Sequence, residues 1–269
     1  MESGVAPTPL FSWKGKTMSV LEIVVLALAG FGAGVVNTIA GGGTFLTFPA
    51  LVWAGVPPVA ANATSAVSVF PGYLGGAIGF LSELKTLSRA QMIRLTAITL
   101  AGGLTGSLLL LVSSNEAFSL IVPFLLFFAT TAFLLGGKLR AWAERRSRAL
   151  KPEGALGLFL VSVYGGYFNG GLGIVLLALF AMWGWRDIHL MNGVKNGLSF
   201  ALSAISVATF AVAGLVVWPM AVLMMVFAVL GGYGGAWIAK AVPASVVRII
   251  VILIGYGMSA IFLGRLFVG

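Results

Sequence analysis

The sequence contains no cysteine and a single histidine, and only 9% of its 269 residues are charged. The absence of cysteine excludes disulfides, thiolate nucleophiles and thiolate metal sites. One histidine cannot form a histidine metal cluster, so we expect neither a metal nor another cofactor. The seven acidic residues lie near the ends of apolar segments or in loops and form no pairs. The lack of cysteine, of a histidine cluster and of acidic pairs argues against an enzyme.

Hydrophobic residues make up 59% of the chain, and charged residues are far below the roughly 25% of an average soluble domain. Several apolar runs approach the ~20 residues with which a helix spans a bilayer. They lack the ten-residue alternation of a membrane β-barrel. We therefore predict an all-α polytopic membrane protein. The net charge of +9 is gathered in short loops, which indicates membrane orientation rather than nucleic-acid binding. No cleavable signal peptide is evident.

The basic stretch "GGKLRAWAERRSRALKPEG" (136–154) divides the chain and is expected in the cytoplasm. We expect a first transmembrane repeat at 1–137, a linker at 138–153 and a second repeat at 154–269. Each half has one overlong apolar segment followed by three of ordinary length. The segments are predicted at about 18–54, 60–81, 92–113 and 117–137, then 155–184, 193–213, 216–239 and 244–267.

Glycine landmarks also repeat, which favours an internal duplication. Gly102, Gly103 and Gly106 recur 129 positions later as Gly231, Gly232 and Gly235, and both sets are expected to permit close helix packing. If each overlong segment crosses once, the basic loops fall on both sides of the membrane. If each enters and returns, as half-helices or as two spans, every basic loop faces the cytoplasm. We favour the second arrangement, which makes the halves inverted repeats.

Two glycine-rich stretches interrupt the overlong segments, "AGGGTFLTFPAL" (40–51) and "YGGYFNGGLGIVLL" (164–177). Non-helical backbone at membrane depth is tolerated only where protein buries it or where it lines a polar cavity. Interrupted segments at matching positions of two halves point to the binding site of a transporter.

At these residues the chain resembles the TauE/SafE family of sulfite and organosulfur-anion exporters. The resemblance is carried by "GFGAGVVNTIAGGGTFLTFPALVWAGVPPVAANATSAVSV" (30–69) and, more loosely, by "GGYFNGGLGIVLLALFAMWG" followed by "MNGVKNGLSF". It implies a secondary transporter of small anions such as sulfite or sulfonates, in the bacterial inner membrane.

An oxyanion at mid-membrane needs hydrogen-bond donors. The start of a half-helix offers free N–H groups and a partial positive charge, and glycines let an anion approach the backbone. Neutral side chains and one lysine complete the expected substrate site. Its residues are Asn37, Gly41, Gly42, Gly43, Thr44, Thr64, Ser65, Asn169, Gly170, Gly171, Asn192, Lys195 and Asn196.

Each side chain also has a purely structural interpretation. Asn37 and Asn169 can cap the half-helices without touching substrate. Thr64 and Ser65 can bond a carbonyl one turn back, and Lys195 can extend to the membrane interface. His189 can couple a proton or simply face solvent. We favour an alternating-access exporter with protons as a candidate coupling ion. A passive channel, or a subunit of a membrane complex, is the alternative, and homo-oligomerisation stays open.

Overall fold

The computed structural model describes residues 12–13, 16–39, 42–78, 84–145, 154–241 and 244–268. Within these ranges the chain is helical apart from a hairpin in which β1 (Ser12–Trp13) pairs antiparallel with β2 (Lys16–Thr17). The helices of the first half are α1 (Val20–Ile39), α2 (Thr44–Trp53), α3 (Pro58–Ile78), α5 (Arg89–Val112) and α6 (Asn115–Arg145). Those of the second half are α7 (Ala155–Tyr167), α8 (Leu172–Met182), α9 (Ile188–Val212), α10 (Trp218–Ala241) and α11 (Ala244–Val268). The predicted all-α class is confirmed.

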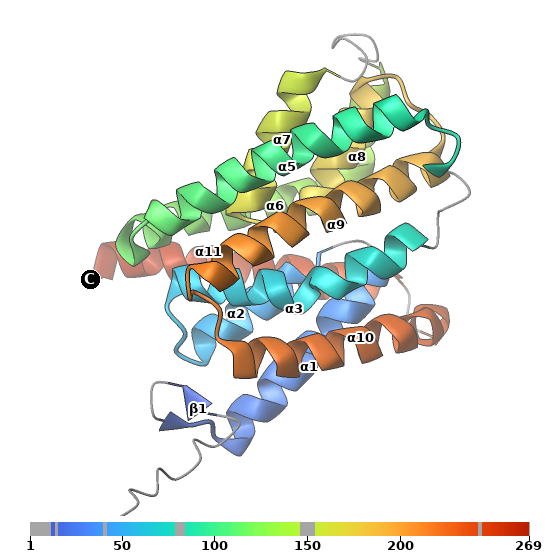
Figure 1. Cartoon of the computed structure of the whole chain (residues 1–269). Helices are drawn as coiled ribbons and strands as arrows, with labels where there is room; N and C mark the ends of the chain where they lie inside the picture. Colours follow the sequence, from blue (N-terminus) through green and yellow to red (C-terminus); the bar gives the residue numbers. More distant parts are fainter. Residues whose placement is uncertain are drawn as a thin grey trace, which may run out of the picture.

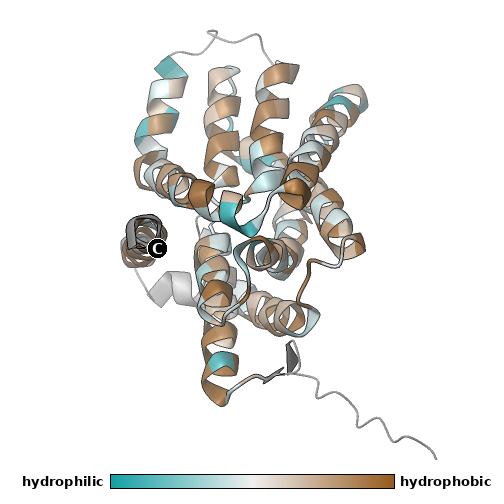
Figure 2. Cartoon of the chain, turned by 90° about the vertical axis from the view of Figure 1, so that its left-hand side faces the viewer, coloured by the Kyte–Doolittle hydropathy of each residue, from teal (hydrophilic) through white to brown (hydrophobic). Residues whose placement is uncertain are grey.

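The helices are built for contact with lipid. Among the described residues, α1, α5, α6 and α9 are long and apolar enough to cross a membrane. Large apolar side chains such as Leu108, Phe124, Val226 and Leu253 are exposed on the outer surface, and Figure 2 shows apolar residues over most of the helices. Exposed apolar surface of this extent marks an interaction surface, here with the bilayer of a multi-pass membrane protein.

Each half contains a broken segment followed by three long helices, the predicted order of elements. The first break lies between α1 and α2, and the second lies between α7 and α8. Gly171 starts the second returning helix with φ +72°, a backbone conformation that suits glycine. Helix α6 continues through 138–145 of the predicted linker, and the rest of that linker lies outside the described residues.

Helices of one half pack against helices of the other. α1 lies along α10, α5 along α7, α3 along α9, and α6 along α11. A methyl group at Gly34 would lie 2.0 Å from the Ala228 carbonyl oxygen, and one at Gly166 would lie 2.2 Å from the Gly103 carbonyl oxygen. These separations are too short for any side chain. A methyl group at Gly106 would likewise lie 2.1 Å from the Val163 carbonyl oxygen, and one at Gly231 would lie 2.0 Å from the Phe31 carbonyl oxygen, so close packing is confirmed at these two of the predicted glycines.

Uncharged turns gather at one end of the long helices. In Figure 1 the turns at 54–57, 113–114 and 213–217 lie at the left, as does the C-terminus. The starts of α5 and α9, which carry Arg89 and Lys195 among others, lie at the right. One end of the molecule therefore carries uncharged turns, and the other end carries basic residues.

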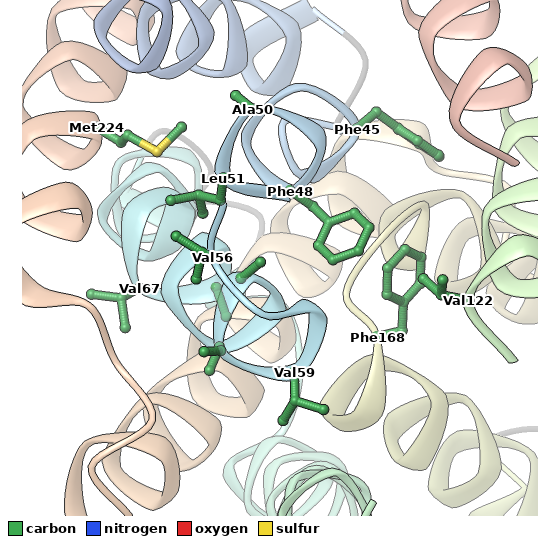
Figure 3. Packing of buried hydrophobic residues seen from close by; sticks show 14 of the residues in the cluster. Phe45, Phe48, Ala50, Leu51, Val56, Val59, Val67, Val122, Phe168 and Met224 are labelled. Carbon is green, nitrogen blue, oxygen red and sulfur yellow. The ribbon is translucent and has the colours of Figure 1, made fainter. Parts of the chain in front are cut away.

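The buried core brings α2 against the second break. Phe48 of α2 makes edge-to-face contacts with Phe168, at a centroid distance of 5.9 Å, and with Phe118 of α6, at 6.3 Å. Figure 3 shows Phe48 and Phe168 facing each other beside Val122. Aromatic pairs in this geometry stabilise a core beyond their buried area. The first returning helix is thereby fixed next to the break of the second half.

Candidate substrate site

The two breaks lie close together along one face of α6. A methyl group at Gly171 would lie 3.3 Å from the Ala129 side chain, and one at Gly42 would lie 3.2 Å from the Phe133 ring. Ala129 and Phe133 are four residues apart on α6, which is about 6 Å along a helix axis. The breaks are therefore neighbours in space, although more than a hundred residues separate them in sequence.

At the first break, Asn37 occupies the start of α2. Its Oδ1 accepts hydrogen bonds from the N–H groups of Gly42, at 3.0 Å, and Gly43, at 2.8 Å. A methyl group at Gly43 would lie 2.8 Å from Asn37 Nδ2, so the missing Cβ makes room for this side chain. Asn37 thus holds the two backbone N–H groups that precede α2, and within this structure its side chain serves the backbone of the break, although α2 itself has no side-chain cap. Thr44 is buried behind it, and Gly41 lies outside the described residues.

Asn37→Ala is expected to lower the free energy of unfolding by about 1 kcal/mol or more, because it removes the acceptor of two hydrogen bonds and each such bond contributes ~0.5–1.5 kcal/mol. The melting temperature of the purified protein in detergent measures this change. Thr105→Ala is the control, because its hydroxyl bonds the Ala101 carbonyl on an exposed face of α5. A melting temperature that falls no further for Asn37→Ala than for Thr105→Ala would contradict a stabilising role of Asn37 at the first break.

At the second break, Asn169 links two helices instead of capping one. Its Oδ1 accepts a hydrogen bond from the Tyr73 hydroxyl of α3, and its Nδ2 donates to Ser203 Oγ of α9, each at 3.3 Å. Asn169 is only 7% exposed. The Tyr164 hydroxyl donates to the Gly170 carbonyl oxygen and braces the turn. The two asparagines, which look alike in the sequence, have different surroundings.

The second break also leaves backbone donors unused. In the part of the chain that the structure describes, the N–H groups of Gly170, Gly171 and Gly173 donate no hydrogen bond. At the first break, by contrast, the Gly42 and Gly43 N–H groups are bonded to Asn37. The positive end of the α8 dipole therefore faces the break with free donors, which suits an anion.

Lys195 lies beside the start of α8. Its aliphatic stem runs over Gly173, where an added methyl group would lie 3.2 Å from Lys195 Cδ. Its Nζ donates to Asn192 Oδ1 at 3.0 Å. Asn196 is the next residue of α9 and is half-buried. The lysine stem therefore packs on a glycine of the second break, and the one hydrogen bond recorded for its ammonium group goes to an uncharged partner.

The two expected hydroxyls on α3 bond other parts of the protein. Thr64 Oγ1 accepts a hydrogen bond from the Val217 N–H just before α10, at 3.0 Å. Ser65 Oγ shares a 2.6 Å hydrogen bond with Thr47 Oγ1 of α2. Both residues are fully buried. These bonds hold α3 to α10 and α2, and the structure does not place either hydroxyl at the second break.

Comparison with known proteins shows the family. The family model described as "Sulfite exporter TauE/SafE" matches residues 26–262. The chain belongs to the TauE/SafE family. It is 27% identical over 245 residues to a probable membrane transporter protein of Haemophilus influenzae, covering 88% of this chain and 93% of the relative. It is also 27% identical over 250 residues to the probable membrane transporter protein YfcA of Escherichia coli, covering 90% of each chain. No solved structure matches the chain.

As a TauE/SafE protein, the chain is a membrane transporter, in agreement with the expectation that it is not an enzyme. Family membership implies an anionic substrate and a lipid bilayer as its surroundings. Sequence reasoning did not single out Tyr73, Tyr164 or Ser203, which complete the surroundings of Asn169. The tyrosines are the one signal that was available, because a buried phenol in an apolar helix usually finds a polar partner.

Proposed function

We propose that this TauE/SafE protein is a secondary transporter that exports small sulfur oxyanions or sulfonates across the inner membrane, with the substrate held at the second break. The observation that carries the proposal is the combination found there: free backbone donors at Gly170, Gly171 and Gly173, with the Lys195 stem packed against the same turn. Donors and a cation around one buried turn suit an anion whose desolvation must be offset.

The expected site residues divide into two groups under this proposal. Direct contacts come from the second half, namely Asn169, Gly170, Gly171, Asn192, Lys195 and Asn196. The described residues of the first half act by holding α2 and α3 in place, namely Asn37, Gly42, Gly43, Thr44, Thr64 and Ser65. The bonds of Asn37, Thr64 and Ser65 to neighbouring elements support this division.

We also propose that the halves are inverted repeats. Exchange of the halves converts the packing of α1 on α10 into that of α7 on α5, and it leaves the pairs α3 with α9 and α6 with α11 unchanged. The uncharged turns at one end and the basic residues at the other support an orientation with the basic end in the cytoplasm. Two halves related by such a symmetry suit alternating access, in which one half moves against the other around a central site.

Coupling to protons is proposed through the substrate itself. Three of the described carboxylates are engaged at helix ends: Glu22 accepts from Ser19, Glu144 pairs with Arg140, and Asp187 caps α9. His189 is exposed in the first turn of α9. A weak-acid anion such as sulfite can carry its own proton. Acidification of one compartment during transport of a fully ionised strong-acid anion would count against this route.

Lys195→Gln is expected to weaken the binding of sulfur oxyanions about tenfold or more, because a hydrogen bond to a charged group contributes ~1.5–3 kcal/mol. Thermal-shift titrations of purified protein with sulfite, sulfate, thiosulfate and sulfoacetate measure the change, with taurine and a cation as further ligands. Lys85→Gln is the matched control, since Lys85 is exposed just before α5. Equal apparent affinities of both variants would remove Lys195 from the site.

The transport mechanism is tested by counterflow. Proteoliposomes loaded with sulfite should accumulate labelled sulfite from outside and saturate with concentration. Flux without counterflow or saturation would favour a passive channel over a carrier.

A further inference from the structure

Between residues 192 and 206, the polar residues of α9 lie on a single face of the helix. At about 100° per residue, they fall within an arc of about 100°, and the residues outside this arc between 192 and 206 are apolar or glycine. The polar residues are Asn192, Lys195, Asn196, Ser199, Ser203 and Ser206. The row extends about 21 Å along the helix axis, compared with the ~30 Å hydrocarbon core of a bilayer.

This face of α9 points at the second break rather than at lipid. Near the basic end, Lys195 packs on Gly173 of α8. Further along, Ser203 accepts a hydrogen bond from Asn169 in the break itself. Other sides of α9 are occupied differently, since Phe200 stacks on Phe70 of α3 at a centroid distance of 4.9 Å.

The inner end of the row has unused hydrogen-bonding capacity. Ser206 is 3% exposed and its hydroxyl has no partner among the described residues. The same holds for Ser162 of α7 and Thr99 of α5, which are 1% exposed and belong to the two helices that pack beside α9. Buried hydroxyls without partners are uncommon and call for an explanation.

The corresponding helix of the first half differs in this respect. On α3, Asn62 donates to the Tyr167 carbonyl oxygen, Thr64 accepts from Val217, and Ser68 donates to the Thr64 carbonyl oxygen. Ser65 is bonded to Thr47. The polar groups of α3 thus join elements of the protein, whereas α9 keeps a polar face with an unpaired hydroxyl at its inner end.

We propose that the polar face of α9, from Asn192 to Ser206, is the route by which the anionic substrate passes between the basic end of the protein and the second break. The inference rests on the proposed function, since it takes a small oxyanion as the occupant. Lys195 attracts the anion at the outer part of the route. Ser199 and Ser203 replace part of its water shell, and Ser206 provides a further hydroxyl at the inner end.

The absence of cysteine makes a thiol-accessibility experiment clean. Ser199→Cys and Ser206→Cys are near-isosteric changes on the polar face, and Ala204→Cys is the control at a similar depth outside the polar face. Each variant is reconstituted in proteoliposomes and treated with an anionic and with a cationic methanethiosulfonate reagent. Sulfoacetate is the competing ligand, because sulfite would react with the reagents themselves.

We expect the thiols at 199 and 206 to react with the anionic reagent at least tenfold faster than the thiol at 204, and sulfoacetate to slow both reactions. Adding Lys195→Gln should abolish the preference for the anionic over the cationic reagent. Labelling at 199 and 206 no faster than at 204, in variants that remain folded, would overturn the route. So would fast labelling that sulfoacetate leaves unchanged while the wild type binds sulfoacetate. If the wild type neither binds nor transports any sulfur oxyanion, the proposed function fails separately, and slow labelling at 199 and 206 would still reject the route.

Discussion

Asn169→Ala is expected to reduce sulfite counterflow about a hundredfold or more in proteoliposomes. The substitution removes one amide that reaches both α3 and α9 and lies beside the free backbone donors of the second break. Under the proposed function it loses hydrogen bonds to the anion, each contributing ~1.5–3 kcal/mol. Initial rates at saturating and at low sulfite concentration would separate a loss of affinity from a loss of turnover.

Asn62→Ala is the matched control for this experiment. Asn62 also joins α3 to the end of α7, through the Tyr167 carbonyl oxygen at 2.8 Å, but it does not lie in the break. We expect this variant to melt at a lower temperature and to keep most of its transport rate. If both variants lost transport in proportion to their loss of stability, Asn169 would be a structural residue only.

Gly34→Ala is expected to prevent normal assembly of the protein. The new methyl group would lie 2.0 Å from the Ala228 carbonyl oxygen and 2.5 Å from the Gly232 nitrogen, so α1 and α10 must move apart along their whole contact. Overpacking in a core usually costs ~1–3 kcal/mol, and a clash between two helix backbones lies at or above the upper end. The yield of monodisperse protein in detergent and its melting temperature should both fall sharply.

Gly137→Ala is the control, and we expect it to change the melting temperature in the opposite direction or not at all. Gly137 is exposed on α6, and no atom lies within 4 Å of an added methyl group. Alanine in a helix is favoured over glycine by ~1 kcal/mol, so this variant should melt at the same or a higher temperature.

Gly166→Ala at the second crossing should behave like Gly34→Ala. Wild-type stability of both crossing variants would contradict the close packing of the two halves.

Most of the fold followed from hydropathy and glycine spacing. Long apolar runs separated by uncharged or basic turns specify membrane helices. The glycine clusters at 102–106 and 231–235 predicted the two close helix crossings. The position of the breaks also followed, because glycine is poorly suited to a helix interior. These features are local in sequence, which is why they could be predicted.

The roles of the side chains at the breaks did not follow in the same way. Thr64 bonds a residue that is 153 positions away, and Tyr73 bonds one that is 96 positions away. Such partners depend on how the helices cross, which hydropathy does not encode. Asn37 and Asn169 illustrate the difficulty. Both precede a glycine run, yet one bonds the nearby backbone of that run and the other bridges two distant helices.

Helix α6 forms a wall common to both breaks, with Ala129 beside Gly171 and Phe133 beside Gly42. A displacement of this helix would therefore change the surroundings of both breaks at once. A bulky substitution at Ala129 or Phe133 would accordingly be felt at both breaks, which lie more than a hundred residues apart in the sequence.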